Sequence, residues 1–231
     1  VYKRQHPFGT DQLGRDVLSR LVYGIRATVF LSLLTMAITS ALGACVGLVS
    51  GFFRNRIDDV LMRICDVMMS FPSEVMILAI VGMTGPGLEN VVIANVVAKW
   101  PWYARMVRSI VRQYSDKDYI RFAKVAGGSS IRIMMRHLLP GTAGELFVLT
   151  TLDTGSVILM ISALSFLGLG VQPPTPEWGM MLNEAKEVMT LYPLQMIPAG
   201  MAILLVVAAF NFLGDSLRDA FDPKHAGRER S

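Results

Sequence analysis

The sequence predicts an all-α protein, a polytopic transmembrane helical bundle, because it is poor in charge and contains three long apolar stretches. Of its 231 residues, 52% are hydrophobic and 17% are charged, whereas a soluble domain carries roughly a quarter charged residues. No charged residue occurs in 27–53, 154–176 or 188–214. Each stretch is longer than the ~20 residues with which a helix crosses the hydrocarbon core. None has the polar face of a soluble helix, which argues against a large soluble bundle.

Five spans are predicted, at 27–53, 60–85, 88–102, 146–171 and 191–214. Charged residues interrupt or flank the second and third, namely Arg63, Asp66, Glu74 and Lys99. Pro72 is expected to kink the second span. The odd number of spans suggests that a sixth is missing upstream, and the chain opens with Val1 and a polar segment rather than a signal peptide.

A row of small residues marks the first span. Gly43, Gly47 and Gly51 recur at every fourth position, and such faces let two helices approach closely in a membrane. We expect this row to pack against another helix and to have no chemical role.

The charge of the loops predicts the orientation. Between Lys99 and Arg136 lie nine basic and two acidic residues, so the positive-inside rule places this loop in the cytoplasm. The loop between the last two spans is acidic over 177–187, which suits the outer side. Alternation then puts 1–26 outside, although it carries five basic and two acidic residues. We expect 1–26 to be an outer-surface segment that lies along the membrane.

The basic loop contains its own helical pattern, whereas an idle connector would show none. Residues 119–125 are expected to form a short helix, and Gly127 and Gly128 to break it. Either Ser129 or Ser130 can cap a second helix.

Apolar residues recur at helical spacing in that second helix, between basic side chains, and are Ile131, Met134, Met135 and Leu138. Pro140 is expected to end it. The pattern predicts a short amphipathic helix beneath the membrane, whose apolar face can dock on a soluble partner.

The stretch 118–141, DYIRFAKVAGGSSIRIMMRHLLPG, resembles the cytoplasmic loop of bacterial binding-protein-dependent ABC importers. In that family the loop reads Glu-Ala-Ala, three residues, Gly, and later a helix that ends in Leu-Pro. The resemblance implies that this coupling helix sits in a cleft of the ATPase subunit. The chain departs from the pattern at Arg121 and Phe122, where the family usually has Glu and Ala. The residues to which the resemblance assigns ATPase coupling are Ala123, Gly127, Ser130, Ile131, Met135, Arg136, His137, Leu139 and Pro140.

Three further stretches resemble the C-type inner-membrane permease of the dipeptide, oligopeptide and nickel branch. They are FGTDQLGRDVLSRLVYGIR at 8–26, SFLGLGVQPPTPEWGMMLNE at 165–184 and FNFLGDSLRDAFDP at 210–223. The resemblance covers about 6–224 and accounts for the missing first span. It implies an outer-surface segment at 1–26, a transmembrane permease domain at 27–224 with the coupling loop at 118–141, and a C-terminal tail at 225–231.

The resemblance implies a multi-pass subunit of the bacterial inner membrane that imports its solute by ATP-driven alternating access. Its implied partners are a second homologous permease, two ATP-binding cassette subunits that use ATP and Mg, an extracytoplasmic solute-binding protein and the lipid membrane; no nucleic acid is expected. WYARMVRS at 102–109, TLDTG at 151–155 and PLQM at 193–196 look more like nickel permeases. The expected solute is therefore nickel or a metal chelate, with di- or oligopeptides as the alternative. An ion-coupled secondary transporter or a structural membrane subunit would be the rival classes.

Two acidic residues in predicted spans are candidate pathway residues. Glu74 follows Pro72, so it would line a cavity beside the kink or face a neighbouring helix. Asp153 lies near the start of the fourth span, and intramembrane carboxylates usually face the bundle interior or a path. The alternative for Asp153 is an ordinary interfacial position.

No pattern in the sequence predicts catalysis. Its histidines and cysteines have no metal-ligand spacing, and no Gly-rich phosphate loop followed by Lys and Ser or Thr is present. We expect no catalytic residue, no metal site and no bound cofactor, so that a partner subunit must hydrolyse ATP.

Overall fold

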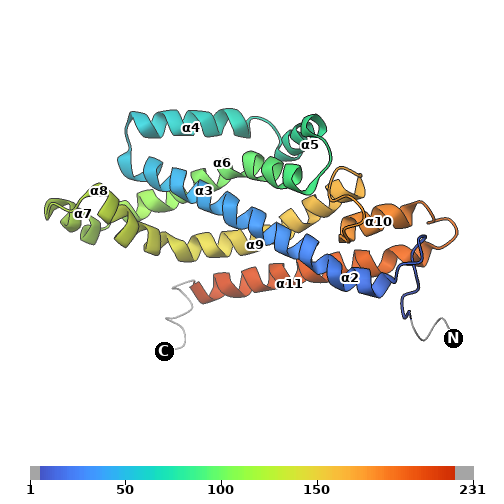
Figure 1. Cartoon of the computed structure of the whole chain (residues 1–231). Helices are drawn as coiled ribbons and strands as arrows, with labels where there is room; N and C mark the ends of the chain where they lie inside the picture. The colour runs from blue at the N-terminus through green and yellow to red at the C-terminus, as the bar shows by residue number, and fades with distance from the viewer. Residues whose placement is uncertain (1–5, 222–231) are drawn as a thin grey trace, which may run out of the picture. The chain divides into compact units, whose positions relative to one another are not determined.

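The computed structural model describes residues 6–221, and this part of the chain is helical apart from turns and one isolated bridge between Thr10 and Asp16 (Figure 1). The predicted tail at 225–231 lies outside the described residues, as do 1–5 of the outer segment and 222–224 of the permease domain. In chain order the helices are α2 (Val17–Ile25), η1 (Arg26–Phe30), α3 (Leu31–Phe53), α4 (Arg56–Met69), α5 (Ser73–Thr84), α6 (Leu88–Ser115), α7 (Asp118–Val125), α8 (Ser130–Ile133), η2 (Met134–Leu138), α9 (Leu139–Phe166), α10 (Trp178–Lys186), η3 (Pro193–Met196) and α11 (Ile197–Phe221).

Several helices begin at a polar side chain that accepts a backbone N–H of the first turn. The capping residues are Asp16 for α2, Asn55 for α4, Ser129 for α8 and Glu177 for α10. Each satisfies one of the N–H groups that a helix leaves without an internal partner at its start. The polar residues between the apolar stretches thus determine where these helices begin.

The described residues contain three helical runs that are long and apolar enough to cross a membrane. They are Val17–Phe53, Ser130–Phe166 and Pro193–Phe221, and they contain or overlap the predicted first, fourth and fifth spans. A fourth crossing results if α4 and α5, which are bent by 80° at the break between them, count as one span.

The second and third predicted spans differ from expectation. Pro72 does not kink one helix; the helix stops at Met69 and a new one starts at Ser73, since proline removes a helical hydrogen bond and clashes with the preceding turn. The third predicted span is the first half of α6, which continues to Ser115 and contains Pro101. The first part of the predicted basic loop is therefore helical. The count of five spans stays a prediction.

The chain forms two compact units. Within the described residues, the first comprises 6–36, 76–95 and 153–212, and its apolar core joins α2, α9, α10 and α11. The buried residues of this core are Val17, Ile158, Trp178, Met181, Ala199 and Ile203. The N-terminal segment and α10 thus belong to the same packed body.

Within the described residues, the second unit comprises 37–75, 96–152 and 213–221. Its main apolar cluster joins α3, α6, α7, α8 and η2 through Ala44, Leu48, Val107, Val111, Ile120, Ile133, Met134 and Leu138.

The glycine row of α3 packs directly on α6, as the sequence predicted. A Cβ placed on Gly47 would lie 2.5 Å from the Ala104 carbonyl oxygen and 2.8 Å from Val107 Cβ. One placed on Gly51 would lie 2.8 Å from a methyl of Val111. The two helices are therefore closer than any side chain at these positions would allow.

Candidate functional site

The predicted coupling loop, residues 118–141 and here named the coupling segment, is a short helix followed by the first turns of a long one. α7 ends at a turn in which Gly127 has a φ of +79°, a conformation that favours glycine. The Ser129 side chain then caps the next helix. From there the chain is helical without interruption to Phe166.

Pro140 does not end a helix, contrary to expectation. It is the second residue of α9, which directly follows the π-helical turn η2. The Leu139 N–H bonds to the Met134 carbonyl, five residues back. A wide turn of this kind, together with the start of a new α-helical register, accommodates a residue that has no N–H to donate. The predicted amphipathic helix is thus the beginning of the long helix Ser130–Phe166.

One face of the coupling segment is buried against α6. Ile120, Ile133 and Leu138 are at most 2% exposed. They pack in the same cluster as Val107 and Val111 of α6. The segment is therefore fixed to a long helix rather than suspended in solvent.

The opposite face exposes large apolar side chains. Phe122 is 73% exposed, Val125 86%, Ile131 71% and Met135 57%. These four residues, here named the coupling surface, are flanked by basic side chains of the same helices. Exposed apolar groups in one place mark an interaction surface.

The nine predicted coupling residues all lie within the coupling segment, and their coupling role stays a prediction. The exposed ones are Gly127, Ile131, Met135, Arg136 and Pro140, and the half-buried ones are Ala123, Ser130, His137 and Leu139.

A buried ion cluster joins α4 to α6 in the same unit. Asp58 of α4 is 3% exposed and accepts two hydrogen bonds from Arg108, at 2.5 Å from Nε and 2.7 Å from Nη2. It also accepts hydrogen bonds from Arg112 Nη2 and from Ser50 Oγ of α3. One carboxylate thus binds three helices, with a bidentate arginine as its strongest partner.

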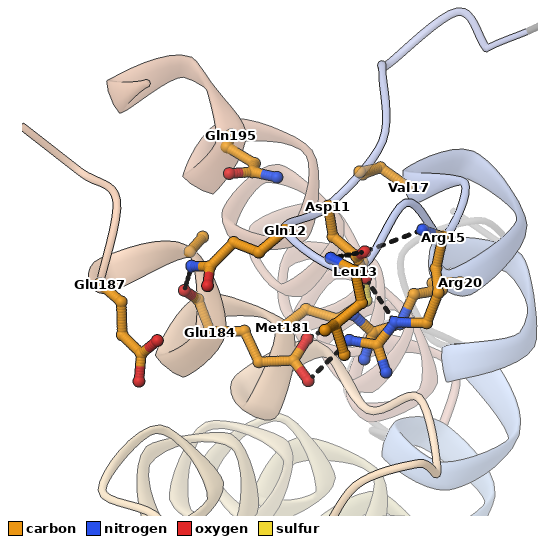
Figure 2. A pocket seen from close by; sticks show the side chains of 11 residues that line it. Asp11, Gln12, Leu13, Arg15, Val17, Arg20, Met181, Glu184, Glu187 and Gln195 are labelled. Carbon is orange, nitrogen blue, oxygen red and sulfur yellow. Dashed lines mark hydrogen bonds and ion pairs between the residues drawn. The ribbon is translucent and has the colours of Figure 1, made fainter. Parts of the chain in front are cut away.

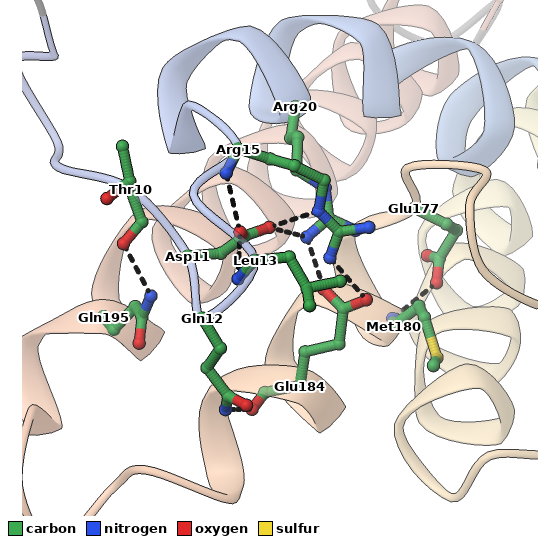
Figure 3. A network of polar contacts seen from close by, with 10 residues as sticks. All are labelled: Thr10, Asp11, Gln12, Leu13, Arg15, Arg20, Glu177, Met180, Glu184 and Gln195. Carbon is green, nitrogen blue, oxygen red and sulfur yellow. Dashed lines mark hydrogen bonds and ion pairs between the residues drawn. The ribbon is translucent and has the colours of Figure 1, made fainter.

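A second ion cluster lies in the first unit, where the N-terminal segment meets α10 (Figure 2). Asp11 binds Arg15 at 2.6 Å and Arg20 at 2.7 Å, and Glu184 binds the same two arginines. Figure 3 shows these groups pointing toward one another across the two segments. They line a cavity of about 250 Å³.

The hydrogen bonds around Asp11 lower the pKa of its carboxyl group. Burial would raise the pKa of Asp11, but hydrogen bonds from the Arg15 N–H, the Arg15 guanidinium and the Leu13 N–H outweigh it and hold the pKa below its usual value. The carboxylate is therefore charged at neutral pH and keeps both arginines paired.

Glu177 is a fully buried acid at the start of α10. It accepts hydrogen bonds from Thr28 Oγ1 at 3.1 Å, Ser162 Oγ at 3.3 Å and the Met180 N–H at 2.9 Å. Thr28 lies in the π-helical turn η1, and Ser162 lies in α9. Glu177 thus connects three helices of the first unit.

The two pathway candidates lie in different units. Glu74, in the second, is exposed in the first turn of α5 and accepts a hydrogen bond from Ser73 Oγ at 3.0 Å. Asp153, in the first, is half-buried within α9. Their role in a pathway stays a prediction.

Sequence reasoning missed both ion clusters and the role of Glu177. Asp58 is 50 positions from Arg108, and Arg20 is 164 positions from Glu184. A signal was present for the cluster of Asp11, Arg15, Arg20 and Glu184, since the basic charge of 1–26 conflicted with its predicted outer location. Glu184 supplies one carboxylate from another part of the chain and thus removes part of this conflict.

The described residues contain no group of three or more His, Cys, Asp or Glu side chains arranged to hold a metal ion.

The chain's likeness to known proteins gives its class. A family model described as "Binding-protein-dependent transport system inner membrane component" matches residues 43–226.

Relatives match the chain over nearly its whole length. The chain is 42% identical over 226 residues to the metal-staphylopine import system permease protein CntC of Staphylococcus aureus, covering 98% of this chain and 78% of the relative. It is 40% identical to the nickel transport system permease protein NikC of Escherichia coli K12, covering 95% and 79%. It is 43% identical to the glutathione transport system permease protein GsiD of an Escherichia coli O6 strain, covering 96% and 74%.

The fold is also similar to that of a solved transporter. A chain of the MetNI methionine ABC transporter, in inward-facing conformations, matches with a TM-score of 0.71 at 16% identity, covering 88% of this chain and 97% of that one. A second crystal form gives 0.69 at 18% identity. The chain thus belongs to the binding-protein-dependent transport system inner membrane components, and is a C-type permease subunit of a bacterial ABC importer.

Proposed function

We propose that this permease imports nickel or a metal chelate by ATP-driven alternating access. Two of the relatives support this solute by name, one for metal-staphylopine and one for nickel. The glutathione permease is as similar in sequence, so di- or oligopeptides are the alternative. Overall identity does not discriminate between them, and the nickel-like stretches at 102–109, 151–155 and 193–196 favour the metal.

The partners of the proposed complex are a second homologous permease, two ATP-binding cassette subunits and an extracytoplasmic solute-binding protein. The ATPase subunits would bind ATP and Mg, and this chain would bind neither. Glu74 and Asp153 are the proposed polar residues of the pathway in this chain. A partner permease would supply the remaining pathway surface.

The exposed coupling surface is the observation that carries the ATP-driven mechanism. It presents Phe122, Val125, Ile131 and Met135 to solvent, while the opposite face of the same segment is locked onto α6. An apolar helix face of this kind fits a groove of a soluble partner. Docking of an ATPase subunit there would transmit its closure through α6 and the long helix Ser130–Phe166.

Sidedness is supported within each unit separately. In the second unit, Arg54 of the predicted inner turn pairs with Asp116 beside the coupling segment at 3.0 Å. In the first unit, Gln12 donates to the Glu184 carbonyl at 2.9 Å and Gln195 to the Thr10 carbonyl at 3.1 Å. Segments predicted to share a side of the membrane are therefore neighbours.

The solute is tested by uptake of radiolabelled nickel and of a labelled tripeptide, side by side, in cells with and without this gene. We expect loss of nickel uptake alone. Loss of peptide uptake alone would move the assignment to peptide import. Uptake that persists after ATP depletion would instead support an ion-coupled mechanism.

Coupling is tested by Ile131→Glu, with Leu13→Glu as the matched control. The two side chains are of equal size and both are exposed, Ile131 at 71% and Leu13 at 75%, so neither change disturbs a core. We expect only Ile131→Glu to lose co-purification of the ATPase subunits and ATP-driven uptake, because it places a charge in the docking surface. Full retention of the ATPase subunits in Ile131→Glu would contradict the proposed docking.

A further inference from the structure

The buried carboxylate of Asp58 is placed where a movement of the coupling segment would reach α4. Its partners Arg108 and Arg112 are one helical turn apart on α6, and the structure brings both to the same carboxylate. Asp58 itself lies in the first turn of α4. The contact is therefore between the first turn of α4 and the last two turns of α6.

The same two turns of α6 hold the coupling segment. Val107 and Val111 each precede one of the arginines, and both are at most 1% exposed. They pack with Ile120 of α7 and with Leu138 of η2. A packed core of this kind transmits displacement rather than absorbing it. A shift of the coupling segment is consequently expected to move the guanidinium groups of Arg108 and Arg112, which donate hydrogen bonds to Asp58.

Burial of the ion pair is by itself weak evidence for a role in stability, because desolvation offsets most of the Coulombic gain. Apolar packing already attaches α4 to α6 through Met62, Cys65 and Ala104. A second, exposed ion pair, Arg105 with Asp66, also joins the two helices. The buried cluster adds a fixed geometry, since a bidentate arginine sets both the distance and the orientation of the carboxylate.

We propose that Asp58 is a positioning residue that makes α4 follow the coupling segment, so that ATP hydrolysis stays tied to solute transport. This inference rests on the proposed function. It differs from the docking of the ATPase, which involves the coupling surface and none of the Asp58 contacts. Asp58 would act through Arg108 and Arg112 and would touch neither solute nor nucleotide.

The test uses the full complex, with both permeases, the ATPase subunits and the binding protein, reconstituted in liposomes. The variant is Asp58→Asn, which keeps the size of the side chain and removes its charge. The matched control is Asp66→Asn, which removes the exposed ion pair between the same two helices. The readout is the number of ATP molecules hydrolysed per labelled solute molecule imported, measured together with the yield of assembled complex.

We expect Asp58→Asn to raise the ATP consumed per solute about tenfold, within the range of coupling changes caused by residues outside the binding sites. Asp66→Asn should leave this ratio within about twofold of wild type, as expected for an exposed pair. A ratio that stays at the wild-type value in Asp58→Asn, while uptake and hydrolysis fall in step with complex yield, would mean that Asp58 is only structural. That outcome overturns the inference and leaves the proposed function intact.

Two further results keep the test decisive. If Asp58→Asn does not assemble, Arg112→Gln takes its place, because this side chain is 38% exposed and one of two arginines at the carboxylate. An unchanged ratio in Arg112→Gln would then overturn the inference. Absence of ATP-driven uptake in the wild-type complex would refute the proposed function and the inference together.

Discussion

Replacing Gly47 by alanine tests how closely α3 and α6 are packed. The added Cβ would lie 2.5 Å from the Ala104 carbonyl oxygen, 2.8 Å from Val107 Cβ and 2.9 Å from the Arg108 nitrogen. These atoms belong to backbone or sit next to it, so no side-chain rotation relieves the contact. To restore an ordinary separation of about 3.5 Å, the two helices must move apart by roughly 1 Å.

A separation of that size affects more than one residue. A gap of about 0.5–1 Å already forfeits a quarter to a half of the attraction between packed atoms, and the buried residues Ala44, Leu48 and Val111 line the same contact. Overpacking of a core typically costs about 1–3 kcal/mol. We expect Gly47→Ala to lower the free energy of unfolding by about 2 kcal/mol.

The control is Gly82→Ala in α5, because a Cβ on Gly82 would meet nothing within 4 Å. Both variants gain about 1 kcal/mol of helix propensity, so the difference between them reports the steric clash alone. Unfolding of the complex in lipid nanodiscs, followed by heat or denaturant, measures this difference. Equal stability of the two variants would refute the close packing of α3 on α6.

Two further predictions concern the end of the first unit where the N-terminal segment meets α10. Because the pKa of Asp11 is depressed, its contribution to stability is present above its unfolded pKa of roughly 4 and is lost as the pH falls through the folded value. The hydrogen-exchange protection factors at residues 9–17, which are corrected for the intrinsic rate at each pH, should therefore fall below about pH 4, and Asp11→Asn should show low protection at every pH; a wild-type profile in that variant would contradict the role of the carboxylate. Replacing Glu177 by alanine removes a helix cap and leaves the hydroxyls of Thr28 and Ser162 without their buried acceptor. We expect a loss of about 3 kcal/mol in the same unfolding measurement, against a change below about 0.5 kcal/mol for the exposed Glu187→Ala.

Features set by residues close in sequence were predictable. The four-residue spacing of Gly43, Gly47 and Gly51 predicted a helix contact, and α3 makes it with α6. The short helix before Gly127 was also predicted, since a glycine that adopts a positive φ reliably ends a helix. The apolar stretches predicted three helical runs that can cross a membrane, because length and hydropathy alone decide whether a helix is able to span it.

Features set by residues far apart in sequence were not predictable. Asp58 stands among charged residues at the start of a helix, so nothing local distinguishes it from an exposed residue. Its burial depends on two arginines that arrive from another helix. The prediction that Pro140 ends a helix was wrong for a local reason. The rule for proline assumes an α-helical register, and the turn before α9 is π-helical.

The ion cluster of Asp11, Arg15, Arg20 and Glu184 has a consequence for the insertion of the chain into the membrane. Asp11 is synthesised before both arginines, but Glu184 emerges 164 residues after Arg20. For most of translation the segment therefore carries positive charge that its final partner has not yet neutralised. A chain interrupted before α10 would keep that charge, and by the positive-inside rule this charge would oppose the outer location predicted for the segment. Synthesis of Glu184 is thus expected to favour the predicted outer position of the N-terminal segment.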